Sequence, residues 1–212
     1  LIPESGLFII GEHFQRVNHQ LLGLPTAKKE DIKFVKSHAQ ALAQSRKIIK
    51  KLNLIPIQHI DTAGAAEEIF RLGDPSIGAI ASKMAAEIYG LKIMKENVED
   101  AEHNTTRFLI MAKKPVMPPI NIETSVTTII FKVRSVPAAL YKVLGGFATN
   151  GINLTKLESY IGGKEMNAAR FYVDAEGHPE SNAMKNALEE MTFYSEPNSI
   201  KIIGTYNRKK KI

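Results

Sequence analysis

The stretch IGAIASKMAAEIYG, residues 77–90, has the pattern of a buried strand that runs directly into a helix. Five small or apolar residues, Ile77–Ala81, predict the strand, and Ser82 stands where a helix N-cap is expected. Gly90 tolerates the left-handed backbone conformation that ends many helices. Apolar strands that alternate with amphipathic helices are typical of a mostly parallel sheet, so this stretch predicts an α/β fold.

A similar strand-to-helix unit lies upstream. Ile32–Val35 predicts a buried strand. Ser37 and Gln40 stand three residues apart, which is the spacing of a capping box in which each side chain binds a backbone N–H at the helix start. We therefore expect a helix that opens here and continues through Leu52.

A third unit lies between these two. Ile55–Ile60 predicts its strand, and Thr62 stands at an N-cap position before the next helix. That helix is expected to end near Leu72, because Gly73 can take the left-handed conformation after it.

The three strand-to-helix turns also predict a ligand site. A helix N-terminus presents unpaired N–H groups and a partial positive charge, which favour carboxylate or phosphate. Open α/β sheets bind their ligands at the carboxyl ends of the strands, where these turns fall. The hydroxyls of Ser37, Thr62 and Ser82 either only cap their helices or contribute to such a site, and both interpretations stay open.

The second half of the chain has a different order of elements. Its strands and helices follow the order βαββαβ over about 80 residues, which is the ferredoxin-like arrangement. Such a sheet leaves strand edges that can pair with a second copy. The expected elements are a strand Val126–Val133, a helix Pro137–Asn150, a strand Ile152–Tyr160 turned by Gly162 and Gly163, a strand Ala168–Asp174, a helix Ser181–Thr192 and a strand Ser199–Tyr206.

A proline-rich segment separates the two halves. Residues 113–124 read KKPVMPPINIET, and each of its three prolines lacks a backbone donor and disfavours helix. We expect one domain over residues 1–112, a linker over 113–124 and a second domain over 125–212.

Composition excludes several classes of protein. The 212 residues, 44% apolar and 24% charged, fit one or two ordinary globular domains. The chain has no cysteine, which excludes disulfides, a thiol nucleophile and Cys-ligated metal sites. The six histidines show no tight ligand spacing, so we expect no metal. No apolar run approaches the length of a membrane span, and we expect a cytoplasmic protein with no membrane partner.

The net charge of +6 is concentrated at one end of the chain. Arg208–Lys211 carry four of these charges, and the remaining residues carry only +2. A short basic terminus is typically a solvated end, and no aromatic side chains interleave it as a base-stacking platform would require. The sequence therefore predicts no nucleic-acid partner.

One short motif suggests chemistry. Thr106 and Arg107 stand side by side in the sequence, just before the apolar run Leu109–Met111. A hydroxyl beside a guanidinium can donate a hydrogen bond while the arginine holds a carboxylate. By itself the triplet Thr106–Phe108 is a weak signal.

In context the chain resembles the prephenate dehydratases, over nearly its whole length. Five stretches occur in the family's order, which makes chance agreement unexpected. The stretches are Ser37-His38-x-Gln40-Ala41-Leu42-Ala43-Gln44 with Ala39 in place of the family's proline, Asp61-Thr62-Ala63-x-Ala65-Ala66, Asn104-Thr105-Thr106-Arg107-Phe108, Ser135-Val136-Pro137-Ala138-Ala139-Leu140 and Ile152-Asn153-Leu154-Thr155-Lys156-Leu157-Glu158-Ser159.

The resemblance implies a lyase that converts prephenate to phenylpyruvate, with loss of water and carbon dioxide, in L-phenylalanine biosynthesis. It implies part of a two-lobed catalytic domain of the periplasmic-binding-protein type II fold, followed by a ferredoxin-like regulatory ACT domain. It also implies that the reaction needs neither a metal ion nor an organic cofactor. The catalytic residues implied are Thr106, Arg107 and Phe108, and the substrate-binding residues implied are Ser37, His38, Gln40, Thr62 and Ala63.

For the ACT domain, the resemblance implies feedback inhibition by L-phenylalanine bound between two copies, in a homodimer or a dimer of dimers. Two departures bear on this expectation: Tyr160 and Ile161 replace the family's Arg-Pro pair, and Ala138 replaces a glycine. The implied effector contacts are Ala138, Ala139, Leu140, Asn153, Leu154, Glu158 and Ser159.

The start of the chain suggests an alternative. Leu1 is not an initiator methionine, and the resemblance begins in mid-domain, so we expect a missing N-terminal lobe and little turnover by this chain alone. The alternative is a catalytically inactive remnant that only binds an amino acid and dimerises through its ACT domain.

Overall fold

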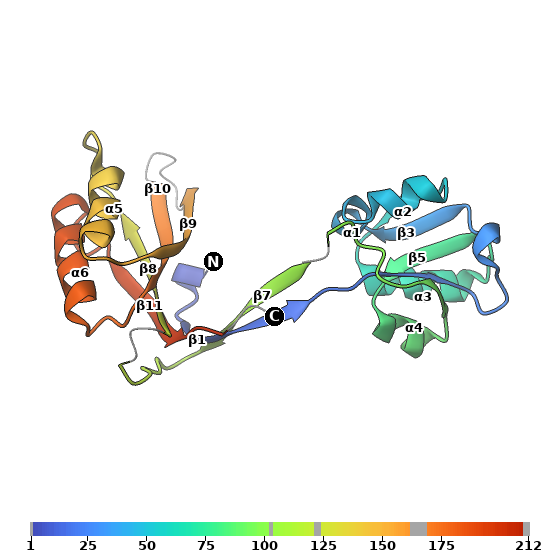
Figure 1. The fold of residues 1–212 in the computed structure, drawn as a ribbon, viewed down its shortest axis with the longest axis horizontal. Coiled ribbons are helices and arrows are strands. Elements are labelled where there is room, and N and C mark those ends of the chain that lie inside the picture. Colours follow the sequence, from blue (N-terminus) through green and yellow to red (C-terminus); the bar gives the residue numbers. More distant parts are fainter. Residues whose placement is uncertain (1, 102–103, 121–123, 162–168, 210–212) are drawn as a thin grey trace. The chain divides into compact units, whose positions relative to one another are not determined.

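A computed structural model of the chain describes residues 2–101, 104–120, 124–161 and 169–209. These residues form two compact units, each built on its own sheet (Figure 1). One unit is Gln15–Thr106, and the other combines Leu1–Phe14 with Arg107–Ile212. No helix among the described residues is long and apolar enough to cross a membrane.

The unit Gln15–Thr106 contains a five-stranded sheet in the order β4-β3-β5-β2-β6. β3 pairs in parallel with both β4 and β5, as the sequence predicts, whereas β2 runs antiparallel to β5 and β6. The sheet is therefore mixed. Its strands are β2 (Gln20–Gly23), β3 (Phe34–His38), β4 (Ile55–His59), β5 (Ile77–Ala81) and β6 (Lys92–Lys95).

Helices follow each parallel strand of this sheet, and the apolar side chains between sheet and helices form two buried clusters. β5 has the predicted bounds, and the Ser82 hydroxyl accepts a hydrogen bond from the Ala85 N–H at 3.1 Å. Gly73 and Gly90 have φ of 66° and 62°, which confirms both predicted helix ends. The helices are α1 (Ala39–Ala43), α2 (Arg46–Lys51), α3 (Thr62–Leu72) and α4 (Lys83–Tyr89), with a 3-10 turn at Lys29–Asp31.

The predicted cap at Ser37 is wrong. Ser37 lies within β3, fully buried, and its hydroxyl donates to the Ile80 carbonyl at 2.6 Å. β3 extends farther than expected because His38 still pairs with β4, so His38 becomes the cap of α1. The expected continuous helix is also interrupted, since α1 ends before Ser45 and α2 begins after it.

The predicted cap at Thr62 is shifted by one residue. Thr62 is the first residue of α3, and Asp61 is its N-cap, with a carboxylate oxygen 2.6 Å from the Gly64 N–H. A carboxylate is a stronger acceptor than a hydroxyl, and its negative charge suits the positive end of the helix.

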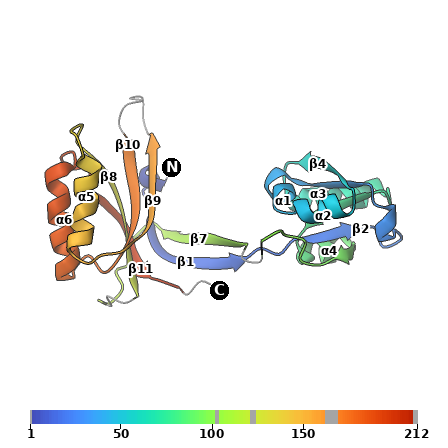
Figure 2. The ribbon, with the colours of Figure 1, turned by 45° about the horizontal axis from the view of Figure 1, so that its top comes forward.

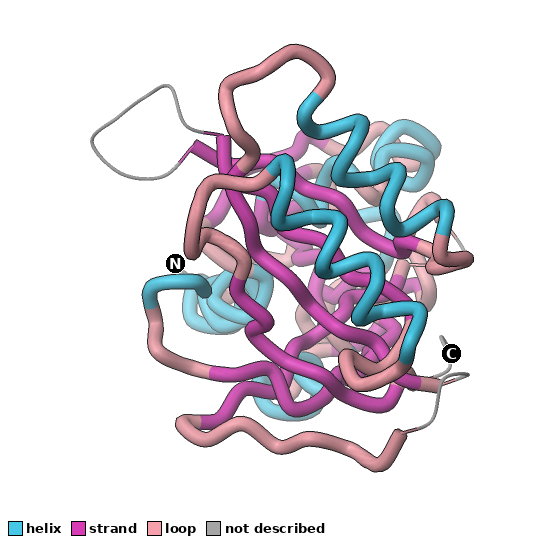
Figure 3. Tube along the Cα trace, turned by 90° about the vertical axis from the view of Figure 1, so that its left-hand side faces the viewer, coloured by secondary structure: helices cyan, strands magenta, loops and turns pink. Residues whose placement is uncertain are grey.

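The second unit contains the predicted βαββαβ order. Its two helices lie side by side on one face of the sheet, over a shared apolar core (Figures 2 and 3). The predicted turn at Gly162 and Gly163 lies outside the described residues. The elements are β8 (Ser125–Lys132), α5 (Ala139–Thr149), β9 (Leu154–Ile161), β10 (Ala169–Glu176), α6 (Asn182–Tyr194) and β11 (Lys201–Asn207).

Two strands from outside this region extend the same sheet. β1 (Phe8–Arg16) pairs in parallel with β11, and β7 (Thr105–Ala112) lies beyond β1, giving the order β7-β1-β11-β8-β10-β9. The compact units therefore divide the chain differently from the expected boundary at residue 112, because residues 1–14 and 107–112 lie with the second sheet. Local sequence patterns do not report such a distant parallel pairing.

The proline-rich segment contains no helix among its described residues, in agreement with its sequence. Its described residues 113–120 form neither helix nor strand. The segment is hydrogen-bonded to His178, a fully buried residue that follows β10: its Nε2 lies 3.1 Å from the Pro118 carbonyl oxygen. The Nδ1 of His178 accepts from the Glu180 N–H, so Nε2 carries the proton and donates to Pro118.

Gly204 allows β1 to approach β11. A β-bulge in β11 precedes Gly204, which pairs with Ile9, and a Cβ placed on Gly204 would lie 2.9 Å from the Ile9 carbonyl carbon. Only glycine fits this close backbone approach.

We therefore expect Gly204→Ala to lower the free energy of unfolding by about 1–3 kcal/mol, because the added methyl group forces β1 and β11 apart. The measurement is chemical denaturation of the purified protein. Gly145→Ala is the matched control. Gly145 lies inside α5 with nothing within 4 Å of an added Cβ, so the same methyl should stabilise the protein by about 0.5–1 kcal/mol. Equal effects at the two positions would contradict this account of Gly204.

Candidate active site

A cavity of about 420 Å³ lies in the unit Gln15–Thr106, at the carboxyl ends of β3 and β4. Both strands lead there into helices, α1 and α3, so the cavity lies where an α/β sheet typically binds ligands. The described residues that line it are Val17, His19, His38, Gln40, Ala41, Gln44, Ile60, Asp61, Thr62, Asn104 and Thr106.

The two helix starts determine the polar groups of the cavity. His38 Nδ1 accepts from the Gln40 N–H at 3.2 Å, so in the neutral ring Nε2 holds the proton and can donate to a ligand. Asp61 caps α3, and the remaining N–H groups of the first turn, which begins at Thr62, have no partner within the helix. The site thus offers N–H donors and a positive helix end to an anion.

A polar network in the wall of the cavity was not predicted. The side-chain amides of Gln44 and Asn104 bind each other reciprocally at 3.4 and 3.2 Å, and Gln44 Oε1 lies 3.4 Å from His19 Nε2. The Asn104 carbonyl also accepts from the Val17 N–H at 2.8 Å. These contacts fix the backbone that leads to Thr106. Gln44 and Asn104 both lie inside the motif stretches, which was the only sequence signal for them.

Strand geometry places the three residues of the triplet Thr106–Phe108 on alternating faces of β7. Thr106 and Phe108 are exposed and Arg107 is half-buried, as the two-residue period of a strand requires. Thr106 lines the cavity, whereas Arg107 and Phe108 are not among the described residues that line it. Of the expected pair of a hydroxyl and a guanidinium, only Thr106 is among the described lining residues.

The other implied substrate-binding residues divide in the same way. His38, Gln40 and Thr62 line the cavity together with Thr106. Ser37 is fully buried with its hydroxyl on Ile80, and Ala63 lies in the first turn of α3, outside the described lining.

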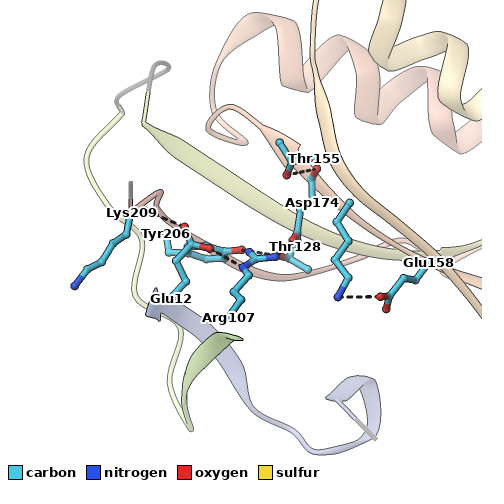
Figure 4. Close-up of polar contacts among 9 residues, drawn as sticks. Glu12, Arg107, Thr128, Thr155, Glu158, Asp174, Tyr206 and Lys209 are labelled. Carbon is cyan, nitrogen blue, oxygen red and sulfur yellow. Dashed lines mark hydrogen bonds and ion pairs between the residues drawn. The ribbon is translucent and has the colours of Figure 1, made fainter. Parts of the chain in front are cut away.

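Arg107 instead binds groups within its own sheet (Figure 4). Its Nε lies 2.7 Å from a Glu12 carboxylate oxygen, its Nη1 lies 2.6 Å from Asp174, and its Nη2 donates to the Tyr206 hydroxyl at 2.7 Å. Glu12 and Asp174 are 2% and 0% exposed, so both carboxylates depend on this cation.

The ionisation of the network follows from its burial. Burial by itself would lower the pKa of Arg107, but the hydrogen bond to Asp174 and the surrounding negative charges raise the pKa above its ordinary value. Burial, with the charge of Asp174, raises the pKa of Tyr206 to about 12. Arg107 is therefore a permanent cation and Tyr206 a neutral phenol at physiological pH.

The implied effector positions fall into two groups in the second unit. Ala138 is the N-cap residue of α5 with φ of 60°, a left-handed conformation that a glycine adopts with less strain. Ala139 and Leu140 follow it in the first turn, Ala139 buried and Leu140 packed against the apolar core.

The second group lies along β9. Asn153, just before the strand, donates to Glu176 at 3.1 Å, and Leu154 packs against the core. Farther along, Glu158 pairs with Lys156 at 3.2 Å, and Ser159 is exposed. β9 is the outer strand of the described sheet, so this group lies at an edge.

Among the described residues, no three His, Asp or Glu side chains gather as a metal site would require.

Comparison with known proteins identifies the family to which the chain is similar. A family profile described as prephenate dehydratase matches residues 1–116. A bifunctional N-acyl-homoserine lactone acylase/prephenate dehydratase from Komagataeibacter europaeus is 48% identical over 97% of this chain and 73% of its own length. An arogenate dehydratase/prephenate dehydratase 1 from Arabidopsis thaliana, named as chloroplastic, is 38% identical over 97% of this chain. The chain spans 55% of that plant relative's length.

A solved structure agrees with the same assignment. Prephenate dehydratase from Arthrobacter aurescens, determined in complex with L-Phe, superposes with a TM-score of 0.85 at 28% identity. The match covers 95% of this chain and 66% of that one. Both sheets of the mixed α/β fold thus have counterparts in a known structure.

Proposed function

Because this chain belongs to the prephenate dehydratase family, whose members are carbon–oxygen lyases of phenylalanine biosynthesis, we propose that its protein converts prephenate to phenylpyruvate. The observation that carries the proposal is that one cavity collects residues from three separate motif stretches: His38 with Gln40, Thr62, and Thr106. Sequence motifs that are far apart and converge on one cavity support a shared chemical role.

The chemistry of the cavity fits this substrate. Prephenate carries two carboxylates, and the N-terminus of α3 with the Nε2–H of His38 offers donors to an anion. In the reaction the ring C–O bond breaks, and the hydroxyl leaves as water after taking up a proton from the solvent. The bond to the ring carboxylate breaks as well, its electron pair completes the aromatic ring, and carbon dioxide leaves.

Thr106 is proposed to assist the departing hydroxyl. A threonine hydroxyl is a weak acid, so its contribution is a positioned hydrogen bond to the oxygen that gains charge in the transition state. The geometry of β7 supports this role, because it exposes Thr106 into the cavity while Asn104 is fixed by Gln44.

We expect Thr106→Ala to lower the rate of phenylpyruvate formation by roughly 10²–10³-fold, the usual loss when one such donor is removed. Thr106→Ser keeps the hydroxyl and should retain most of the activity. The measurement is the appearance of phenylpyruvate from prephenate, with arogenate as a second substrate, using the protein as its gene encodes it.

Thr105→Ala is the matched control, because Thr105 precedes Thr106 on the opposite face of β7 and is not among the described lining residues. Equal losses from the two alanine variants would count against the role of Thr106. If the unsubstituted protein forms no phenylpyruvate but binds L-phenylalanine, the alternative of a non-catalytic amino-acid-binding protein is supported instead.

We also propose a division of the chain into part of a periplasmic-binding-protein-like catalytic domain (residues 1–112), a linker (113–124) and an ACT domain (125–212). The family profile matches residues 1–116, and the βαββαβ order begins at β8, which support this division. Residues 1–14 and 107–112 would then belong by descent to the catalytic domain while extending the sheet of the regulatory one.

The ACT part is proposed to bind L-phenylalanine between two copies of the chain. β9 runs parallel to β8, since both are antiparallel to β10, so Asn153 and Ala138 lie near opposite ends of the unit. The 11 residues of α5 separate these ends by about 16 Å, too far for one small amino acid to contact both. Pairing of two β9 edges would bring Ala138 of one copy near Asn153 of the other, and the L-Phe complex of the Arthrobacter relative supports the choice of ligand.

We expect L-phenylalanine at 100 times its Kd to stabilise the protein by about 2.7 kcal/mol through mass action, seen as a higher melting temperature. Asn153→Ala should weaken this shift, while Thr149→Ala, an exposed change at the other end of α5 from Ala138, should not. Sedimentation velocity with and without ligand tests the pairing. No thermal shift at millimolar ligand would contradict the effector proposal.

The relative from K. europaeus supports a second candidate activity. Its name includes N-acyl-homoserine lactone acylase, and its identity of 48% extends over nearly the whole of this chain. We propose amide hydrolysis of an N-acyl-homoserine lactone as a second reaction of the protein. A preparation active on prephenate that releases no free fatty acid from this compound would overturn it.

A further inference from the structure

Arg107 follows Thr106 directly in the sequence, yet its side chain is engaged elsewhere. All three guanidinium nitrogens have partners in the second sheet: Nε with Glu12, Nη1 with Asp174 and Nη2 with Tyr206 (Figure 4). The next inward-facing residues of β7, Leu109 and Met111, pack against the apolar cluster on the same face. Arg107 therefore holds β7 onto this sheet.

The hydrogens of the network can be assigned. Thr128 Oγ1 lies 2.6 Å from Asp174 Oδ1, and a carboxylate can only accept, so the Thr128 proton points to Asp174. Thr128 Oγ1 must then accept from the Tyr206 hydroxyl at 3.3 Å, and that hydroxyl accepts from Arg107. The side chains of Arg107, Asp174, Thr128 and Tyr206 thus form a closed ring of hydrogen bonds, and the donor of each bond is assigned.

The charge balance keeps Arg107 in this ring. Two buried carboxylates, Glu12 and Asp174, share one guanidinium, and each needs a further donor. Thr128 supplies one of these donors to Asp174, and the backbone N–H of Lys209 supplies the other to Glu12 Oε1 at 2.9 Å. Moving Arg107 to a substrate carboxylate would leave both buried charges without their cation.

The donor from Lys209 connects this ring to the implied effector position. Arg208, the preceding residue, forms an ion pair with Glu176, and Glu176 accepts at 3.1 Å from the side chain of Asn153. A series of contacts therefore leads from Asn153 to Arg107. It passes through Glu176, then Arg208 and Lys209, and then Glu12.

We propose that Arg107 is a positioning residue for Thr106, and that Arg208 and Lys209 link it to the effector position at Asn153. The inference rests on the proposed function, because it assigns a role to Thr106 and an effector to Asn153. Arg107 touches no substrate in this scheme. It fixes the position of β7, from which Thr106 projects. Arg208 and Lys209 in turn fix Glu12, which holds Arg107.

The backbone donor of Lys209 offers a selective test. Lys209→Pro removes the N–H that Glu12 accepts, whereas Lys209→Ala keeps it and removes the same side chain. In Lys209→Pro we expect the concentration of L-phenylalanine for half-maximal inhibition to rise about fivefold or more, the lower range of allosteric coupling. Lys209→Ala should be inhibited as the unsubstituted protein is, and both variants should keep the thermal shift with L-phenylalanine.

A second variant tests the positioning role. Tyr206→Phe removes the hydroxyl that Arg107 and Thr128 share and leaves the buried ring in place. We expect kcat to fall about tenfold with KM within about twofold, because only the transition-state contact of Thr106 is disturbed. Amide hydrogen exchange in residues 104–112 should be faster in Tyr206→Phe and Lys209→Pro than in Lys209→Ala.

The outcomes separate the inference from the proposed function. If the unsubstituted protein makes phenylpyruvate and Lys209→Pro is inhibited like Lys209→Ala, the inference is overturned and the function stands. If the unsubstituted protein makes none, the function fails and hydrogen exchange decides: equal exchange in the three variants overturns the inference. A rise in KM at constant kcat in Tyr206→Phe also overturns it, since that pattern marks a group that binds substrate.

Discussion

The ion pairs of Arg107 with two buried carboxylates are the constraint on which the second sheet depends. The network takes one residue from each of five neighbouring strands: Arg107 on β7, Glu12 on β1, Tyr206 on β11, Thr128 on β8 and Asp174 on β10. Removing one partner of such a buried pair typically costs about 3–5 kcal/mol, a large part of the 5–15 kcal/mol that keeps a domain folded. The desolvation of three charged groups offsets much of the attraction between them.

The pairing of Arg107 has a chemical consequence for its two neighbours on β7. A strand directs successive side chains to opposite faces, so the face that gives Arg107 to the sheet leaves Thr106 and Phe108 on the other face. An arginine held between buried carboxylates is not free to bind a substrate anion. The anion donors proposed for the cavity are therefore other, fixed groups: the first-turn N–H groups of α3 and the imidazole of His38. Asp61 adds a negative charge to the same wall, and its bond to the Gly64 N–H directs that charge toward the helix.

Local signals in the sequence predicted most elements, and they failed where two neighbouring side chains compete or where pairing is distant. Ser82, Gly73 and Gly90 act alone at their helix ends and were predicted correctly. Thr62 and Ser37 each stand beside a residue that caps better or remains in the strand, Asp61 and His38, so both caps moved by one residue. The parallel pairing of β1 with β11 joins residues almost 200 positions apart, and its only trace in the sequence is a glycine inside a strand, Gly204.

At the candidate site, too, the sequence predicted some features correctly and others wrongly. Residues of three motif stretches line one cavity, but of the three predicted helix starts only those after β3 and β4 lie there, and Ser82 is not among the described lining residues. The carboxyl ends of the parallel strands β3 and β4 share an edge of the sheet, which brings these two helix starts together. The triplet Thr106–Phe108 was interpreted as one chemical unit because its members are adjacent in sequence. In a strand, neighbouring residues direct their side chains to opposite faces, and exposed and half-buried residues do alternate along β7. The side chains of Arg107 and Thr106 are joined through the backbone between them, so the positioning role proposed for Arg107 acts through the strand and not through the charge of the guanidinium.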